Sequence, residues 1–215
     1  MRTFNRIALS LCLGIFSSLA LAHEGHQEPA PANPANPATP ATPAAQPASG
    51  TRDAKTWFTD TPLQDQNGQT LRFYSDALQN RVVLLNVIFT SCNDACPLIT
   101  QKLKEVREVL GDKAEGITFI SLTSDPLRDT PAVLKAYTLK QGVEDPHWLF
   151  LTGDKAQMDL VLGRIGQIVP TPEQHSTQLI VGDVANKRWS KIRPDAPAAA
   201  IAQRLQLLTM PLVGR

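Results

Sequence analysis

The segment Val82–Pro97 constrains the fold of this chain more than any other. It begins with the apolar run VVLLNVIF, which is typical of a strand buried on both faces. The run ends in the polar sequence TSCNDAC, and the residues after Pro97 repeat apolar side chains at helical spacing as far as Leu110. Because proline in a first helical turn loses no hydrogen bond, the segment predicts a strand, a turn and a helix in succession.

Two cysteines, Cys92 and Cys96, lie in this turn, the second at or near the expected start of the helix. The partial positive charge of a helix N-terminus stabilises a thiolate, which is both a nucleophile and a ligand for soft metals. If the intervening residues form a turn or a helix, the two sulfurs are close enough to share a metal or a disulfide. Two buried structural cysteines, or one structural disulfide, remain the alternative. A third cysteine, Cys12, lies in the leading apolar segment.

Residues 1–22 have the pattern of a secretory signal. Arg2 and Arg6 precede an apolar core, Ile7–Leu21, and the sequence Ala-Leu-Ala at 20–22 fits a cleavage site. A membrane span takes about 20 apolar residues, so we expect cleavage and export to a bacterial periplasm, without a permanent membrane anchor. An uncleaved segment would instead anchor the protein. Removal of the signal would leave the mature protein with two cysteines, which can pair with each other.

Residues 23–55 are expected to form a tail and linker. Cleavage after Ala22 would place His23 and His26 beside a free amine, a combination that can hold Cu(II) or Ni(II), although a plain flexible tail is the alternative. Residues 27–50 are mostly Pro, Ala, Asn and Thr and cannot form a core, so they predict an extended, disordered tether. The formal net charge of the chain is +1, and no basic field favours a nucleic-acid partner.

Residues 56–215 are predicted to form the folded domain. Asn67-Gly68 indicates an N-terminal hairpin with strands at 57–63 and 71–74. The remaining expected elements are strands at 117–123, 148–151, 177–181 and 187–192, and helices at 131–142, 154–162 and 197–208. Strands and helices alternate early, and a hairpin and a helix follow. The fold class is therefore α/β, a sandwich with a mixed central sheet that is parallel at helical crossovers and antiparallel at the last hairpin.

Three motifs in this order resemble the SCO/SenC family, thioredoxin-fold copper chaperones of cytochrome c oxidase assembly. They are FTSCNDACP at 89–97, SDPLRDTP at 124–131 and His175-Ser176 ahead of a strand. The resemblance covers about residues 56–215 and implies a thioredoxin-like sandwich with a copper site made by Cys92, Cys96 and His175. Cu(I) is soft and favours thiolates, and imidazole suits either oxidation state of copper. Such a three-coordinate site is open enough to pass the ion on.

The chain departs from the family pattern at two positions. Asn93 replaces a proline after the first cysteine, and Gln174 replaces an acidic residue directly before His175. An acid there can orient the imidazole, and loss of such a partner commonly changes metal affinity by about 10–100-fold. Glu173, one position away, is a candidate substitute.

Two further groups of polar residues have simple structural interpretations. His147 lies in an expected loop and is interpreted as a solvated residue, not a ligand. Asp125, Arg128 and Asp129 follow a strand and precede a helix, with Asp129 or Thr130 as the expected helix cap. We interpret the charged cluster as a local ion pair and cap, with a docking surface beside the metal site as the alternative.

The resemblance favours a copper chaperone that supplies a copper-accepting protein, such as the CuA centre of an oxidase. The second hypothesis is a thiol–disulfide oxidoreductase with Cys92 and Cys96 as its redox pair, which reduces the cysteines of a metal acceptor or senses redox state. A periplasmic thiol reductant would then be a partner. The two activities can belong to one cycle, because only the dithiol binds copper. His175 discriminates between them, since disulfide exchange needs no imidazole. A purely structural disulfide domain stays open, and a thiol peroxidase fits the cysteine pair poorly.

Overall fold

The structure is a computed structural model, and it describes residues 53–211. The predicted signal segment, Cys12 and the tail histidines His23 and His26 lie outside these residues. The described residues belong to one compact unit. No helix between residues 53 and 211 is both long enough and apolar enough to cross a membrane.

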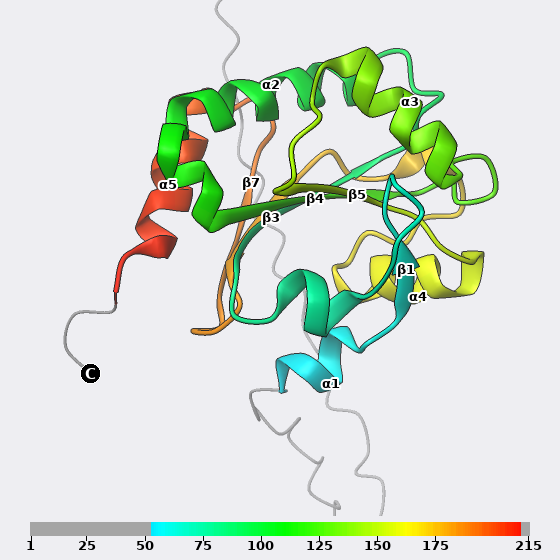
Figure 1. Cartoon of the computed structure of the whole chain (residues 1–215), viewed down its shortest axis with the longest axis horizontal. Coiled ribbons are helices and arrows are strands. Elements are labelled where there is room, and N and C mark those ends of the chain that lie inside the picture. The colour runs from blue at the N-terminus through cyan, green and yellow to red at the C-terminus, as the bar shows by residue number, and fades with distance from the viewer. Residues whose placement is uncertain (1–52, 212–215) are drawn as a thin grey trace, which may run out of the picture. The chain divides into compact units, whose positions relative to one another are not determined.

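A five-stranded mixed sheet forms the centre of the domain (Figure 1). The strands are β3 (Val82–Ile88), β4 (Ile117–Thr123), β5 (Trp148–Leu151), β6 (Leu179–Asp183) and β7 (Arg188–Ile192), in the spatial order β5-β4-β3-β6-β7. Strands β3, β4 and β5 are parallel, whereas β6 is antiparallel to both β3 and β7. The predicted sheet is therefore confirmed. All residues of β4, and all of β3 after Val82, are buried, as expected for strands covered on both faces.

Helices cover both faces of the sheet (Figure 1). One face packs against α2 (Ala95–Leu110), α3 (Pro131–Gln141) and α5 (Ala198–Thr209), which share one apolar cluster. The other face packs against α1 (Ala54–Phe58), the π-helix Phe73–Leu78 and α4 (Lys155–Arg164), which share a second cluster. Short 3-10 helices occupy Gly111–Gly116 and Pro172–Gln174. From residue 82 onward, the predicted elements lie within three residues of the observed ones.

The N-terminal strand predicted at 57–63 is wrong. Residues Ala54–Phe58 form α1 instead, and Asp53 caps this helix by accepting a hydrogen bond from the Thr56 N–H at 3.2 Å. Residues 59–61 separate α1 from a short strand, β1 (Pro62–Gln64), which pairs with β2 (Thr70–Arg72) around the predicted turn. The helix is favoured because it buries Phe58 against the second cluster. The predicted hairpin is thus confirmed in a shorter form.

A glycine on β6 determines the position of a tryptophan on β7. Gly182 lies opposite Trp189, and a Cβ atom on Gly182 would lie 2.2 Å from Trp189 Cε3. The indole therefore rests directly on the backbone at Gly182. Its other neighbour is Phe58, whose ring centroid is 5.3 Å away. No side chain fits at position 182 unless the indole moves.

We predict that Gly182→Ala lowers the free energy of unfolding by about 1–3 kcal/mol, because the added methyl overpacks this site. Guanidinium chloride unfolding measures the effect. Gly163→Ala is the matched control, since Gly163 is helical and a Cβ there would meet nothing within 4 Å. That variant should be neutral or gain about 0.5–1 kcal/mol. Equal stability of Gly182→Ala and the wild type would contradict this packing.

Candidate functional site

The cysteine turn connects the carboxyl end of β3 to the start of α2, as predicted. Cys92 is half-buried in the turn, and Cys96 lies in the first turn of α2 with 1% of its surface exposed. Both cysteines are free thiols. The backbone N–H of Cys96 donates a hydrogen bond to Cys92 Sγ, with the two atoms 3.4 Å apart. The start of α2 thus directs its first N–H groups at the sulfur of Cys92.

These N–H groups separate the acidities of the two thiols. Burial raises the pKa of Cys92, but hydrogen bonds from the backbone of Cys96, Asp94 and Ala95 outweigh it, and the net pKa is lowered. Burial raises the pKa of Cys96 to about 12. The thiolate stabilised by the helix N-terminus is therefore Cys92. The sequence motif placed both cysteines near this terminus but did not predict which of them has the lower pKa.

His175 brings the third predicted residue against the buried cysteine. It follows the 3-10 helix Pro172–Gln174 and is 9% exposed. Its Nε2 lies 3.7 Å from Cys96 Sγ, and its ring meets Phe89 edge-on, with centroids 5.7 Å apart. Residues 79 positions apart in the sequence thus meet at one edge of the sheet. His175 is not a surface residue.

The hydrogen bonds of His175 fix its tautomer. Its Nδ1 lies 3.1 Å from the carbonyl oxygen of Ser176, which only accepts, so Nδ1 carries the proton. Burial lowers the pKa of the imidazole, so the ring is neutral near pH 7. Nε2 therefore presents its lone pair toward Cys96. Neutral imidazole with its second nitrogen hydrogen-bonded is the form that ligates metals.

The acidic partner expected for this histidine is replaced by a backbone carbonyl. Gln174 and Glu173 are both exposed, and the Ser176 carbonyl oxygen occupies the Nδ1 side of His175. Within residues 53–211, no three His, Cys, Asp or Glu side chains are gathered closely enough to hold a metal ion as they stand. Cys96 and His175 are in contact with each other. Cys92 is held next to this pair because its Sγ accepts a hydrogen bond from the Cys96 N–H.

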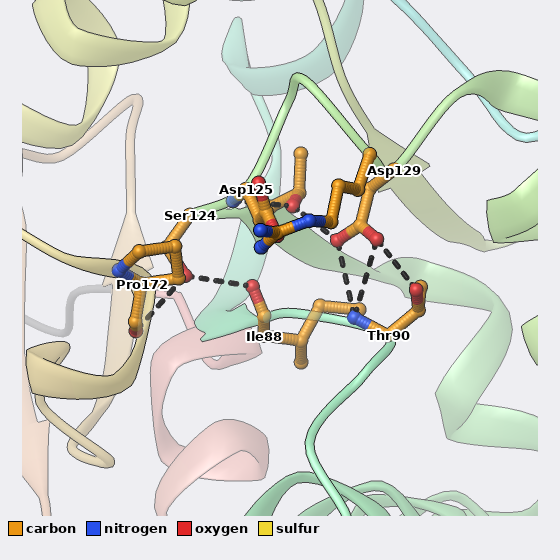
Figure 2. A network of polar contacts seen from close by, with 8 residues as sticks. Ile88, Thr90, Ser124, Asp125, Asp129 and Pro172 are labelled. Atoms are coloured by element: carbon orange, nitrogen blue, oxygen red, sulfur yellow. Dashed lines mark hydrogen bonds and ion pairs between the residues drawn. The ribbon is translucent and has the colours of Figure 1, made fainter.

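A buried carboxylate holds the cysteine turn in place (Figure 2). Asp129 is 1% exposed and accepts hydrogen bonds from the backbone N–H of Thr90, at 3.1 Å, and from its hydroxyl. The hydroxyl of Thr123, at the end of β4, donates to the same carboxylate. Asp129 therefore ties the loop before α3 to the residue two positions before Cys92. This role was missed in the sequence, where Asp129 was a candidate cap.

The expected ion pair and the expected helix cap are both present, and the cap is the second of the two candidate residues. Arg128 Nη1 donates to Asp125 Oδ2 at 2.9 Å, and the Arg128 side chain is 71% exposed. The hydroxyl of Thr130 accepts from the Val133 N–H and caps α3, so the cap is Thr130 and not Asp129. The charged cluster thus has two parts: an ion pair between the exposed Arg128 and the buried Asp125, and the buried carboxylate of Asp129.

Ser124 connects the histidine loop to the same network (Figure 2). Its N–H donates to the carbonyl oxygen of Ile88 at 2.8 Å, where β3 ends. Its hydroxyl lies 3.2 Å from that oxygen and 3.3 Å from the carbonyl oxygen of Pro172. Pro172 begins the turn that leads to His175. The ends of β3 and β4 and the histidine loop therefore converge at Ser124.

His147 lies away from this site. It precedes β5 near the start of β4, its N–H donates to Asp145 Oδ1 at 2.7 Å, and its carbonyl oxygen accepts from Phe119. The side chain is half-buried and lines a small cavity with Arg81. It belongs to a loop, as interpreted from the sequence, but it is only partly solvated.

The fold and this site define a thioredoxin-like protein with a Cys-x3-Cys turn and a histidine in contact with the second cysteine. Residues 50–209 match the SCO1/SenC family. The chain therefore belongs to the SCO1/SenC family, as the sequence motifs indicated.

Individual relatives agree with this assignment. A "SCO2-like protein" of Rickettsia felis is 41% identical over 99 residues, which are 46% of each chain. The "SCO1 protein homolog" of Bacillus subtilis is 30% identical over 91 residues, 42% of this chain and 46% of that one. The matched region thus spans about half the length of these curated relatives.

Solved structures extend the similarity over most of the domain. The copper-bound structure of Bradyrhizobium japonicum ScoI is 28% identical, with a TM-score of 0.58 over 69% of this chain and 96% of that one. The structure of BsSco, described as a member of the Sco family of cytochrome c oxidase assembly proteins with a disulfide switch, is 25% identical. Its TM-score is 0.60 over 70% of this chain and 92% of that one.

We predict that Cys92 reacts with iodoacetamide much faster than Cys96 near pH 7. Cys92 is more exposed and has the lower pKa, whereas Cys96 is buried with a pKa of about 12. The Cys92 rate should rise with pH through its lowered pKa, and the Cys96 rate should stay low. Peptide mass spectrometry after timed alkylation measures both rates. Equal rates would contradict the order of acidity.

We also predict that Asp129→Ala lowers the free energy of unfolding by at least about 1–3 kcal/mol, because it leaves buried donors of Thr90 and Thr123 unpaired. Urea unfolding measures this loss. Lys155→Ala is the control, and removal of its exposed ion pair with Asp159 should cost less than about 1 kcal/mol. If both variants lose the same stability, Asp129 is not the anchor of the turn.

Proposed function

We propose that this protein is a periplasmic copper metallochaperone that supplies copper to a cuproprotein, such as the CuA centre of cytochrome c oxidase. The observation that carries the proposal is the lone pair of His175 Nε2, which faces Cys96 Sγ at 3.7 Å beside a second cysteine. Membership of the SCO1/SenC family supports it, as does the copper held by the related ScoI structure.

The donor set fits Cu(I) as cargo. Two thiolates and one imidazole are soft or borderline ligands, which favour Cu(I) over the hard cations Mg²⁺ and Ca²⁺. Cys92 is the better preformed thiolate, and His175 is neutral with Nε2 free of a proton. Cys96 must lose its proton when it binds, because the ligand is the thiolate. The ion itself would complete the site by drawing Cys92 to the Cys96–His175 pair.

The difference in burial between the ligands suggests how the ion leaves. Cys96 and His175 lie on the buried side, whereas Cys92 is half-exposed in the turn. A thiolate or imidazole of an acceptor would therefore reach the ion from the Cys92 side. The acceptor's ligand would replace Cys92 first, and the two buried ligands would follow. Copper would thus pass by ligand exchange and never be free in solution.

Thiol–disulfide exchange is the second candidate function, favoured by the unequal acidity of the two thiols. The Cys92 thiolate would attack a disulfide sulfur of the partner, whose other sulfur leaves as a thiolate. Cys96 would then lose its proton and attack Cys92 Sγ, which releases the second partner thiolate and forms the Cys92–Cys96 disulfide. The partner is reduced, and a periplasmic thiol reductant would restore the dithiol. The disulfide switch described for the related BsSco supports this cycle.

The signal pattern of residues 1–22 supports export, which is part of the proposal. After cleavage, His23 and His26 would be a separate candidate site for Cu(II). Copper measurements on the mature chain therefore need a variant that removes both tail histidines.

We predict that His175→Ala weakens Cu(I) binding by more than about 100-fold, beyond the effect of losing an outer-sphere partner. Disulfide reduction should remain near the wild-type rate, because exchange uses only the cysteines. Competition with a chelator of known Cu(I) affinity measures binding, and turnover of a small disulfide measures reduction. All proteins carry His23→Ala and His26→Ala, so the tail contributes no copper.

His147→Ala is the matched control and should bind Cu(I) as the wild type does. Cys92→Ser should abolish both activities. Wild-type affinity in His175→Ala would remove the histidine from the site and leave the exchanger as the better proposal. If the wild type binds Cu(I) but does not reduce the small disulfide, only the chaperone function remains as a proposal.

A further inference from the structure

A second candidate binding site lies on the face of the sheet that α1 and α4 cover. A groove of about 710 Å³ separates α1 and the end of α4 from strands β6 and β7. It shares no lining residue with the cysteine turn or the histidine loop. Its apolar walls come mainly from Trp57, Phe58, Ile165, Ile180 and Trp189.

Strand geometry explains why the groove is both aromatic and basic. Residues 189 and 191 alternate along β7, so their side chains project to one face of the sheet. That face carries Trp189 and Lys191, Lys187 lines the groove from the turn before β7, and β7 is an edge strand of the sheet. The Gly182 contact holds the Trp189 indole flat against the sheet and so shapes the floor.

The cations of the groove have no carboxylate partners in the part of the chain that the structure describes. Arg164, Lys187 and Lys191 line it, and no Asp or Glu does. None of these three cations belongs to an ion pair within residues 53–211, whereas Arg188 on the same strand pairs with Asp183 at 2.6 Å. The groove is therefore a site of uncompensated positive charge.

Arg164 is the most constrained of these cations. Its guanidinium stacks on the ring of Trp57, 4.8 Å from the centroid, and the Trp57 indole N–H donates to the Arg164 carbonyl oxygen at 3.1 Å. Its Nε is buried without a hydrogen-bond partner. A buried guanidinium donor with no acceptor is costly unless a ligand supplies the acceptor.

We propose that this groove binds an amphipathic organic anion, with a flat apolar body and one carboxylate. The body would lie between the aromatic side chains of Trp57 and Trp189, since offset or edge-on ring contacts favour flat ligands. The carboxylate would lie at the basic rim, where ammonium and guanidinium groups form short charge-assisted hydrogen bonds. The volume falls within the range of small-ligand sites, about 300–1,000 Å³.

The test uses 1-naphthoate as the probe and the whole mature protein. Quenching of tryptophan fluorescence measures the dissociation constant, with 1-naphthalenemethanol as the neutral analogue of the same shape. We expect the neutral analogue to bind at least about tenfold more weakly, because it loses the charge-assisted hydrogen bonds. Equal affinity for the two probes would overturn the proposal and leave a nonspecific apolar surface.

Charge-neutralising variants locate the site. Lys187→Gln with Lys191→Gln should weaken 1-naphthoate binding by about fivefold to tenfold and leave binding of the neutral analogue unchanged. The matched control neutralises two other exposed lysines, Lys113→Gln with Lys140→Gln, which lie outside the groove. Both double variants should unfold at the wild-type denaturant midpoint.

If the control variant loses as much affinity as the groove variant, the effect is one of net charge and the proposal fails. The Cu(I) affinity of the groove variant should equal that of the wild type, because the groove and the cysteine turn share no residue. The result is independent of the copper proposal, since either site can be confirmed without the other.

Discussion

The contact between the Asp129 carboxylate and Thr90 is the interaction on which the site depends. Thr90 stands between the end of β3 and Cys92, and Asp129 fixes both its backbone N–H and its hydroxyl. The strand alone leaves the direction of the following turn open. Once Thr90 is fixed, α2 starts where its N–H groups meet Cys92 Sγ and where Cys96 is buried against His175. The Asp129 carboxylate belongs to none of the ion pairs found among residues 53–211. It positions the cysteine turn through hydrogen bonds alone.

The N-terminus of α2 gives Cys92 and Cys96 different pKa values and different exposure to solvent. Cys92 receives the N–H groups and keeps access to solvent, so it favours the thiolate. Cys96 lies in the helix behind them, and burial keeps it protonated. The pair therefore combines a reactive thiolate, Cys92, with a thiol that stays protonated, Cys96. The same asymmetry serves metal transfer and disulfide exchange, which is why the cysteines alone do not separate the two functions.

The sequence predicts the parts of this protein whose signals are local. The apolar runs of β3 and β4 and the proline at the first position of α3 predicted those elements, and the motifs led to Cys92, Cys96 and His175. The 57–63 strand was wrong because burial of Phe58 against distant residues favours α1. The position of Asp129 beside a helix start suggests a cap, whereas its partners in the fold are Thr90 and Thr123. Burial by residues far away in the sequence also raises the pKa of Cys96 and encloses His175.

The Ser124 hydroxyl has a consequence for the histidine loop. It carries a single proton, and two carbonyl oxygens, those of Ile88 and Pro172, lie within its reach. The hydroxyl can donate to only one of these oxygens at a time. The carbonyl oxygens of Ile88 and Pro172 therefore compete for the same hydrogen bond. The Ile88 oxygen also accepts from the Ser124 N–H, so it stays paired when the hydroxyl donates to Pro172. One residue at the end of β4 can therefore bond the end of β3 and the loop that carries His175 at the same time.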